Sequence, residues 1–376
     1  MAPQTTPDPG VSQASPPGDT GPRRQVVAAV REALAAALDW FPDDAGNRSV
    51  LVGFSGGMDS TALLHVLGGP GGVRERAGGP ALLAAHLDHQ LRPDSGKQAR
   101  FARTVASSLG IECVSGRQDV RGRAHREGRS IEEAGRLARL DFFAEIARER
   151  GATTVLLAHT LTDQAETVLL QLARGAGTLG LGAMAAVRND ERGLVIVRPL
   201  LAVSRIEINR LVTGAGWPFY SDPSNELEGF TRNRIRRQAL PLLRDSVNPQ
   251  AEAALGRAAA LLRDDEEWLS EITSERFREV ASVVERGGST FVRFPAAALR
   301  EAHPALARRL VREGLGIARG DLRRIGAVHI EAVLGLVRSG RGGSSVNLPG
   351  AVARLEQRVL TVSPAEKAPG GSADQS

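Results

Sequence analysis

Cysteine is almost absent from the sequence: Cys113 is the single one among 376 residues. One thiol cannot build a disulfide framework, a cysteine-based zinc site or a Cys-x-x-Cys redox pair. A single cysteine also excludes reactions that need two catalytic thiols. We interpret Cys113 as a small apolar side chain within a strand.

Two further scarcities narrow the class of protein. No apolar run approaches the ~20 residues that a transmembrane helix needs, and no signal-peptide pattern is visible, so we expect a cytoplasmic enzyme. Lysine occurs only at Lys97 and Lys367, so nearly all of the positive charge behind the net +5 comes from arginine. The guanidinium fork suits bidentate contact with phosphate, which makes the composition compatible with a nucleic-acid partner without demonstrating one.

Length and shifts in composition predict two or three domains. We divide the chain into a disordered tail at 1–22, an α/β domain at 23–222, a helical and basic region at 223–340, a small terminal β segment at 341–362 and a second tail at 363–376. Both tails are rich in Pro, Gly and Ser and have few large apolar side chains, so they cannot bury enough surface to order themselves.

Apolar segments alternate with helical patterns through the first half of the chain. Strands are expected at 50–54, 81–87, 111–114, 153–158 and 194–197. Strands that are apolar throughout and alternate with helices indicate a doubly wound parallel sheet covered on both faces. Ligands of such sheets bind beyond the carboxyl ends of the strands, and polar clusters stand there in this chain. Farther along, we expect helices at 249–278, 296–313 and 321–338, then strands at 345–348 and 352–362.

The first polar cluster is the loop Ser55-Gly56-Gly57-Met58-Asp59-Ser60, between an apolar strand and an apolar helix. Backbone N–H groups and the helix dipole make such a loop an anion site, and the two glycines allow close approach of a phosphate. The loop lacks the lysine of the G-x-x-x-x-G-K-[ST] loop that holds β- and γ-phosphates, and carries Asp59 instead. The structural alternative is an ordinary turn in which Ser55 or Ser60 caps the helix.

The second cluster contains His86, Asp88 and His89 at the end of a strand. In an extended segment alternate residues face opposite sides, so His86 and Asp88 share a face that His89 does not. We therefore favour nucleotide contact or turn formation over a transition-metal site.

The third cluster, His159 to Glu166, places Asp163 and Glu166 three residues apart, on one face of a helix. Paired carboxylates can hold ammonium groups and accept a proton from an attacking amine. The structural alternative is a capping box, with Asp163 as the N-cap and Glu166 at the third helical position.

The loop resembles the pyrophosphate loop of the N-type ATP pyrophosphatases. Together with five further motifs it resembles the tRNA(Ile)-lysidine synthase family, in the family's order from about residue 49 to 241 and more loosely to 362. These motifs are A-x-H-x-D-H-x-L-R-x-x-S at 84–95, E-A-x-R-x-x-R at 133–139, H-x-x-x-D-Q-x-E-T at 159–167, R-P-L-L at 198–201, and D-P-S-N at 222–225 with T-R-N-R-I-R at 231–236.

The resemblance implies an α/β fold of the adenine-nucleotide α-hydrolase type with a helical, tRNA-binding C-terminal region. ATP would adenylate the C2 oxygen of the wobble cytidine of tRNA(Ile) with a CAU anticodon, and diphosphate would leave. Free lysine would then attack C2 through its ε-amine and release AMP, giving lysidine. ATP and Mg²⁺ are the implied cofactors, and whether the chain forms a homodimer stays open.

The resemblance also implies roles for single residues. ATP binding falls to Ser55, Gly56, Gly57, Met58, Asp59, Ser60, His86, Asp88 and His159. The implied catalytic residues are Asp59, Asp163 and Glu166, and Asp59 is also an implied ligand for Mg²⁺. The implied lysine-binding residues are Asp163, Glu166 and Arg232. Contacts with tRNA phosphates fall to Arg136, Arg139, Arg232, Arg234, Arg236 and Arg237, for which a solvated helix is the structural alternative.

Three positions depart from the family's pattern. Thr160 and Thr162 stand where the family commonly has a histidine and an aspartate, which puts the roles of those positions in doubt. Leu140 replaces a common aromatic residue, which we interpret as a change in packing. Two rival functions remain: another ATP pyrophosphatase, such as a tRNA thiolase or an amide-forming ligase, and a non-catalytic RNA-binding protein with a degenerate nucleotide fold.

Overall fold

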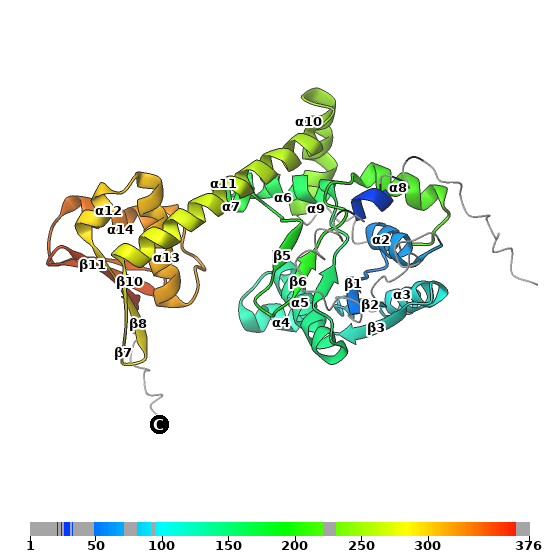
Figure 1. Ribbon diagram of the computed structural model, residues 1–376, viewed down its shortest axis with the longest axis horizontal. Coiled ribbons are helices and arrows are strands. Elements are labelled where there is room, and N and C mark those ends of the chain that lie inside the picture. The colour runs from blue at the N-terminus through cyan, green and yellow to red at the C-terminus, as the bar shows by residue number, and fades with distance from the viewer. Residues whose placement is uncertain are drawn as a thin grey trace, which may run out of the picture. The chain divides into compact units, whose positions relative to one another are not determined.

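The computed structural model describes residues 21, 24, 26–30, 32, 49–70, 81–91, 95–220 and 231–365. They fall into two compact units, Met1–Arg263 and Asp264–Ser376, whose elements are labelled in Figure 1. Most of the expected tails and the D-P-S-N motif at 222–225 lie outside the described residues. Our division of the chain at residue 222 stays a prediction. No helix in the described ranges has the length and apolar character needed to cross a membrane.

The N-terminal unit is built on a sheet with the strand order β3-β2-β1-β4-β6-β5. The strands are β1 (Ser49–Gly53), β2 (Ala81–Asp88), β3 (Glu112–Arg117), β4 (Thr154–Leu156), β5 (Val187–Asn189) and β6 (Val195–Val197). All neighbouring pairs are parallel except β5 with β6, which is an antiparallel hairpin. The predicted parallel sheet is confirmed, and β5 is an addition that the sequence pattern did not predict.

Helices cover both faces of this sheet, as the unbroken apolar strands require. In β1, Val50 and Val52 join one buried cluster and Leu51 joins another on the opposite face. The first cluster is completed by α2 (Met58–Gly68), α3 (Ser95–Ser108) and α8 (Arg205–Gly214), and the second by α5 (Ile131–Arg150). Figure 1 shows α2 and α3 on one side of the strands and α4 (Val120–Glu127) with α5 on the other.

The register of the parallel strands brings three loops together. Gly53 of β1 is paired with Ala85 of β2, and Val52 is paired with Leu156 of β4. The segments that follow β1, β2 and β4 therefore leave the same edge of the sheet side by side. Helix α6 (Leu161–Ala173) follows β4, and the short α7 (Thr178–Leu181) follows α6.

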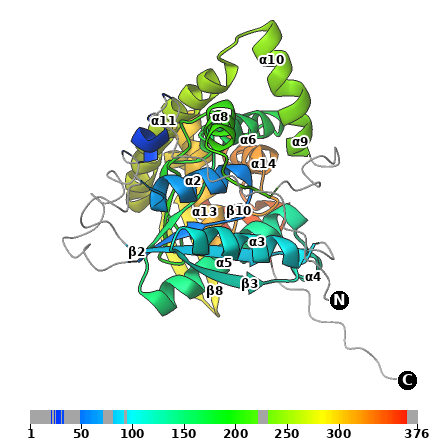
Figure 2. The same ribbon diagram turned by 90° about the vertical axis from the view of Figure 1, so that its right-hand side faces the viewer.

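The basic run of the sequence forms a helix with an interruption. It consists of α9 (Thr231–Arg234), the π-helix η3 (Ile235–Ala239) and α10 (Leu240–Ser246), and Figure 2 shows α9 and α10 as parts of one run. Pro241 has no N–H group to bond to a carbonyl one turn earlier, so the α-helical register is lost there, and the wider π turn lies just before it. The long helix α11 (Ala251–Val280) contains the division between the two units.

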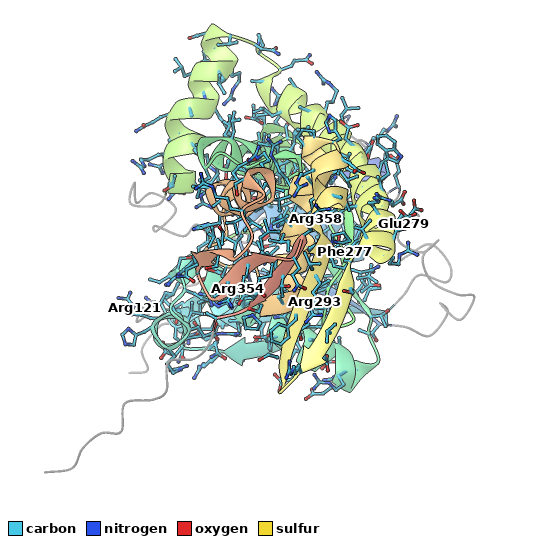
Figure 3. All side chains as sticks on the ribbon, turned by 90° about the vertical axis from the view of Figure 1, so that its left-hand side faces the viewer. Arg121, Phe277, Glu279, Arg293, Arg354 and Arg358 are labelled. Atoms are coloured by element: carbon cyan, nitrogen blue, oxygen red, sulfur yellow. The ribbon has the colours of Figure 1, made fainter. Side chains whose placement is uncertain are left out.

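The C-terminal unit has an antiparallel sheet with the order β7-β8-β11-β10-β9. Its strands are β7 (Ser282–Arg286), β8 (Ser289–Pro295), β9 (Ser344–Leu348), β10 (Ala351–Glu356) and β11 (Val359–Pro364). Helices α12 (Ala296–Glu301), α13 (Pro304–Arg319) and α14 (Ala327–Ser339) share one apolar core with it. Phe277, labelled in Figure 3, meets Phe294 edge-on in this core, with ring centroids 5.5 Å apart.

Three sequence expectations were wrong in this unit, and one hairpin was missed. The segment 352–362 is two strands, because Gln357 and Arg358 turn the chain with φ of 46° and 65° although neither is a glycine. The helix expected at 296–313 is broken at Pro304, which begins α13. The helix expected from 321 begins at Ala327, and the β7–β8 hairpin around Gly287-Gly288 was not predicted.

Candidate active site

The loop from Ser55 to Ser60 is braced by its own hydroxyl groups. The Oγ atoms of Ser55 and Ser60 lie 3.1 Å apart, and Ser60 Oγ donates to the carbonyl of Gly57 at 2.9 Å. Helix α2 begins at Met58, with Gly57 in an extended conformation before it. The loop therefore ends on a helix N-terminus, whose free N–H groups and dipole attract an anion.

Gly56 is the position where glycine is needed. Its φ is +81°, and a Cβ atom there would lie 3.3 Å from the ring of Phe101. The backbone N–H of Tyr220 donates to the carbonyl of Gly56 at 2.8 Å, and Gln98 Nε2 donates to that of Ser55 at 2.8 Å. The loop is thus held from outside by segments that the sequence analysis did not connect with it.

The loop opens into a cavity of about 660 Å³ within the N-terminal unit. Most of the predicted site residues line it, namely Ser55, Gly57, Met58, Asp59, Ser60, His86, Asp88, Arg139, His159, Asp163, Arg232, Arg236 and Arg237. Gly56, Arg136, Glu166 and Arg234 are not among its lining residues. The cavity also exposes His89, Gln98, Arg205, Phe219 and Tyr220, which sequence reasoning did not assign to the site.

Asp59 is a half-buried carboxylate, and one of its oxygens is not used by any described residue. Burial raises its pKa from 3.8 to about 6, although the neighbouring Arg205 favours the ionised form. Arg205 Nη2 lies 3.9 Å from Oδ2, and Oδ1 is buried with no hydrogen-bond partner in the described part of the chain. A hard cation takes oxygen ligands of this kind, so this donor fits a magnesium ion. The described residues contain no group of three or more metal-binding side chains, so such an ion would depend on its substrate for further ligands.

His86 and Asp88 have different tasks. His86 is buried, and its Nδ1 lies 2.9 Å from the carbonyl of Phe54. A carbonyl only accepts, so Nδ1 carries the proton and Nε2 is left as an acceptor. Asp88 Oδ1 accepts from the N–H of Gln90 at 2.9 Å, a turn in which Gln90 has φ of 52°. The residue thus forms a turn, one of the two roles that the pattern favoured.

His159 and His89 are neutral imidazoles on the cavity wall. Burial lowers the pKa of His159 to about 3 and that of His89 to about 4, and Arg139 opposes the charge of both. In each ring Nδ1 is buried and has no hydrogen-bond partner among the residues that the structure describes. Two polar atoms of neutral rings in one cavity are suited to hydrogen bonds with a bound ligand.

The carboxylates of Asp163 and Glu166 converge on Arg236. Arg236 Nη2 lies 3.0 Å from Asp163 Oδ1 and 3.0 Å from Glu166 Oε2, and its Nε donates to Glu166 Oε1. Glu166 is 1% exposed, and burial raises its pKa although the hydrogen bond and charge of Arg236 oppose the shift. The pair therefore binds a cation, and in this structure the cation is a side chain of the same chain.

The capping alternative for Asp163 and Glu166 was wrong in its details. The N-cap of α6 is Thr160, and its capping box is completed by Asp163 at the third helical position. Asp163 Oδ2 accepts from the N–H of Thr160 at 2.9 Å and from its hydroxyl at 3.0 Å, so Oδ1 stays free for Arg236. Glu166 takes no part in the cap. Thr162 donates from its hydroxyl to Glu252 Oε2 at 3.0 Å, so a carboxylate from α11 stands near the position where the family has its aspartate.

Four of the six predicted phosphate-binding arginines line the cavity, namely Arg139, Arg232, Arg236 and Arg237. Arg139 lines it without an ion pair among the described residues, and burial lowers its pKa together with the charges of Arg136 and Arg232. Arg232 Nε lies 3.1 Å from Glu132 Oε1. Arg234 and Arg237 are exposed. A positive wall therefore faces the loop, and the carboxylates of Asp163 and Glu166 are concentrated at Arg236.

Two family profiles match the chain. Residues 30–243 match a PP-loop domain, and residues 294–361 match the TilS substrate binding domain. Among curated proteins, the tRNA(Ile)-lysidine synthase of Geobacter sulfurreducens is 41% identical over 80% of this chain and 61% of its own length. That of Solibacter usitatus is 36% identical over 81% of this chain and 65% of its own length. The chain thus spans less than two thirds of the length of these relatives.

A solved structure shares the fold at low sequence identity. The U34-tRNA thiolase NcsA from Methanococcus maripaludis, with its iron–sulfur cluster, superposes with a TM-score of 0.50 at 16% identity. The superposition covers 64% of this chain and 78% of that one. This likeness concerns the fold alone.

Proposed function

The chain belongs to the PP-loop family, and on that premise we propose that it joins lysine to C2 of the wobble cytidine of tRNA(Ile) at the expense of ATP. The names of its curated relatives and the match of residues 294–361 to a TilS substrate binding domain support this assignment. The observation that carries it is the Asp163–Glu166 pair, which holds a cation at the wall of the cavity that contains the loop.

In the first step the C2 oxygen of the cytidine attacks the α-phosphorus of ATP, and the bond to the bridging oxygen of the β-phosphate breaks. The N–H groups at the start of α2 stabilise the negative charge that accumulates on the departing diphosphate. Arg205 and Arg139 line the same cavity and add positive charge to its wall. Asp59 Oδ1 would hold Mg²⁺, which neutralises phosphate charge when it is bound.

In the second step the ε-amine of lysine attacks C2, and the C2–O bond breaks as AMP leaves. Asp163 and Glu166 orient an ammonium group of lysine in the place that Arg236 occupies, so Arg236 withdraws when lysine binds. One carboxylate accepts the proton that the attacking amine loses. Glu166 is suited to this role, because burial raises its pKa.

The remaining assignments follow from this function. ATP would bind to residues 23–222, and residues 223–340 would contact the tRNA with Arg232, Arg234, Arg236 and Arg237. An enzyme that acts on tRNA(Ile) with a CAU anticodon would work in the cytoplasm. The rival non-catalytic function leaves the raised pKa and the unused oxygen of Asp59 without a purpose.

The test is product formation by the purified full chain. An unmodified tRNA(Ile) transcript with a CAU anticodon is incubated with ATP, Mg²⁺ and lysine, and AMP, diphosphate and the mass of the tRNA are measured. We expect one AMP and one diphosphate for each lysine that enters the tRNA, and no product with a transcript that has guanosine at the wobble position. Full turnover without lysine would refute the assignment and favour another PP-loop ATP pyrophosphatase.

A further inference from the structure

A second group of arginines lies outside the cavity of the N-terminal unit. Arg188 is on β5, Arg198 directly follows β6, and Arg136 is on α5; none of the three lines the cavity. The β5–β6 hairpin brings the first two together, because Val187 is paired with Val197 and the N–H of Arg198 donates to the carbonyl of Ala186. The hairpin is tied to α5 by an ion pair of 2.7 Å between Arg192 and Asp141.

Arg198 is a buried charge that has no counter-ion within the described ranges. It is 7% exposed, and its Nη1 donates to the carbonyl of Ala185 at 2.6 Å. Its Nε is buried with no partner, and no carboxylate makes an ion pair with it in the described part of the chain. Burial lowers its pKa to about 10, and the charges of Arg188, Arg136 and Arg263 act in the same direction. A buried unpaired charge is costly, so its retention calls for a reason.

Of the three arginines, only Arg188 has a carboxylate partner within the described ranges. Asp190 pairs with both Arg188 and Arg192 at 3.0 Å, and Asp141 pairs with Arg192 and Arg123 at 2.7 Å. Within the described ranges neither carboxylate reaches Arg136 or Arg198. Arg136 is exposed and the side chain of Arg188 is 40% exposed, so an excess of positive charge is presented to solvent here.

A purely structural role explains only part of this arrangement. Arg198 and Arg263 donate to the carbonyls of the loop after α7, at Ala185 and Met184. A neutral amide serves that purpose equally well, because Gln164 donates to the same carbonyl of Met184 at 3.0 Å and accepts from its N–H at 3.0 Å. Hydrogen bonds to the loop therefore do not require the charge of Arg198.

We propose that Arg136, Arg188 and Arg198 form an anion subsite that takes a phosphodiester group of the RNA substrate. The inference rests on the proposed function, since it assumes an RNA substrate. Arginine forks suit phosphate, and the two exposed side chains supply the contacts while the buried one strengthens the field. A free phosphate or diphosphate has the same chemistry, but diphosphate is released at the loop from Ser55 to Ser60, inside the cavity.

The test is RNA binding by the full chain without ATP. Binding of the unmodified tRNA(Ile) transcript is measured over a series of KCl concentrations for wild type, Arg136→Gln, Arg188→Gln and Arg198→Gln. We expect each variant to weaken binding about tenfold and to reduce the slope of log K against log salt by about 1. Arg136→Lys keeps the charge and is expected to keep most of the slope.

Arg121→Gln is the matched control, an exposed arginine of α4 in the same unit, labelled in Figure 3. The proposal is overturned if Arg136→Gln and Arg188→Gln bind RNA as Arg121→Gln does. It is also overturned if they lose affinity for inorganic diphosphate and retain their affinity for RNA, because the anion would then be free. Should Arg198→Gln fail to fold, the two exposed variants decide. A wild type that binds the transcript normally and makes no lysidine would refute the proposed function and leave the subsite standing.

Discussion

Arg236 and Arg198 are both arginines of the N-terminal unit, and their surroundings are opposite. Arg236 lies between two carboxylates at the cavity wall, whereas Arg198 is buried among other arginines and has no carboxylate partner in the described residues. The first environment contains negative charge in excess of one cation, and the second contains unneutralised positive charge. Local charge balance therefore distinguishes a place for a cationic substrate from a place for an anion, although the side chain is the same.

The largest expected effect comes from a change beside the loop from Ser55 to Ser60, outside both arginine environments. Asp59→Asn removes the carboxylate beside the loop, and we expect the rate of AMP formation to fall about 10³-fold because charge stabilisation at the phosphates is lost. RNA affinity is expected to remain within about twofold of wild type, since neither arginine group depends on Asp59 for a hydrogen bond. Rapid-quench assays of AMP and salt-dependent RNA binding measure the two quantities. Equal loss of both would mean that Asp59 has a role in folding.

The pH dependence of stability tests the environment of a carboxylate, that of Asp59. The folded protein holds the Asp59 proton with a pKa of about 6, against 3.8 for the ordinary group, so the folded state binds this proton more tightly than the unfolded state does. The stabilisation that this proton gives the folded state is fully present below pH 4. It is lost as pH rises to 6, and the free energy of unfolding then falls by about 3 kcal/mol. Urea titrations at pH 4 to 7 on wild type and Asp59→Asn test this, and the variant should lack that fall.

Glu166→Gln weakens the carboxylate pair and leaves the arginine subsite intact. We expect the KM for lysine to rise about 30-fold, because one partner of a buried charge pair has been removed. Lysine-independent adenylation of the tRNA and the affinity for RNA are expected to stay unchanged. Steady-state kinetics with varied lysine measure the KM, and formation of the AMP adduct of the tRNA measures adenylation. An unaltered dependence on lysine would contradict the assigned role.

The smallest effect concerns the start of α6. Thr160→Ala removes the hydroxyl that accepts from the N–H of Asp163 and donates to its carboxylate. Loss of an N-cap costs about 1 kcal/mol of stability, and Thr160→Ser is expected to restore it. Freed from Thr160, Asp163 can rotate away from Arg236, so the alanine variant should also show a KM for lysine about threefold higher. Denaturant unfolding and kinetics of both variants measure these changes, and a serine variant as impaired as alanine would contradict the cap.

The sequence by itself determined the parallel sheet, the loop at Ser55–Ser60 and the helical face shared by Asp163 and Glu166. Each depends on neighbours a few residues away, as when the apolar run of β1 requires cover on both faces. The tertiary structure decided what these elements meet. Arg236 lies 70 residues from Glu166 in the chain, Tyr220 braces Gly56 from a distant loop, and the arginines at 136, 188 and 198 come from three elements. Burial raises the pKa of Asp59 and separates Arg198 from the carboxylates of the described residues. It exists only after distant segments pack, so no local pattern predicts it.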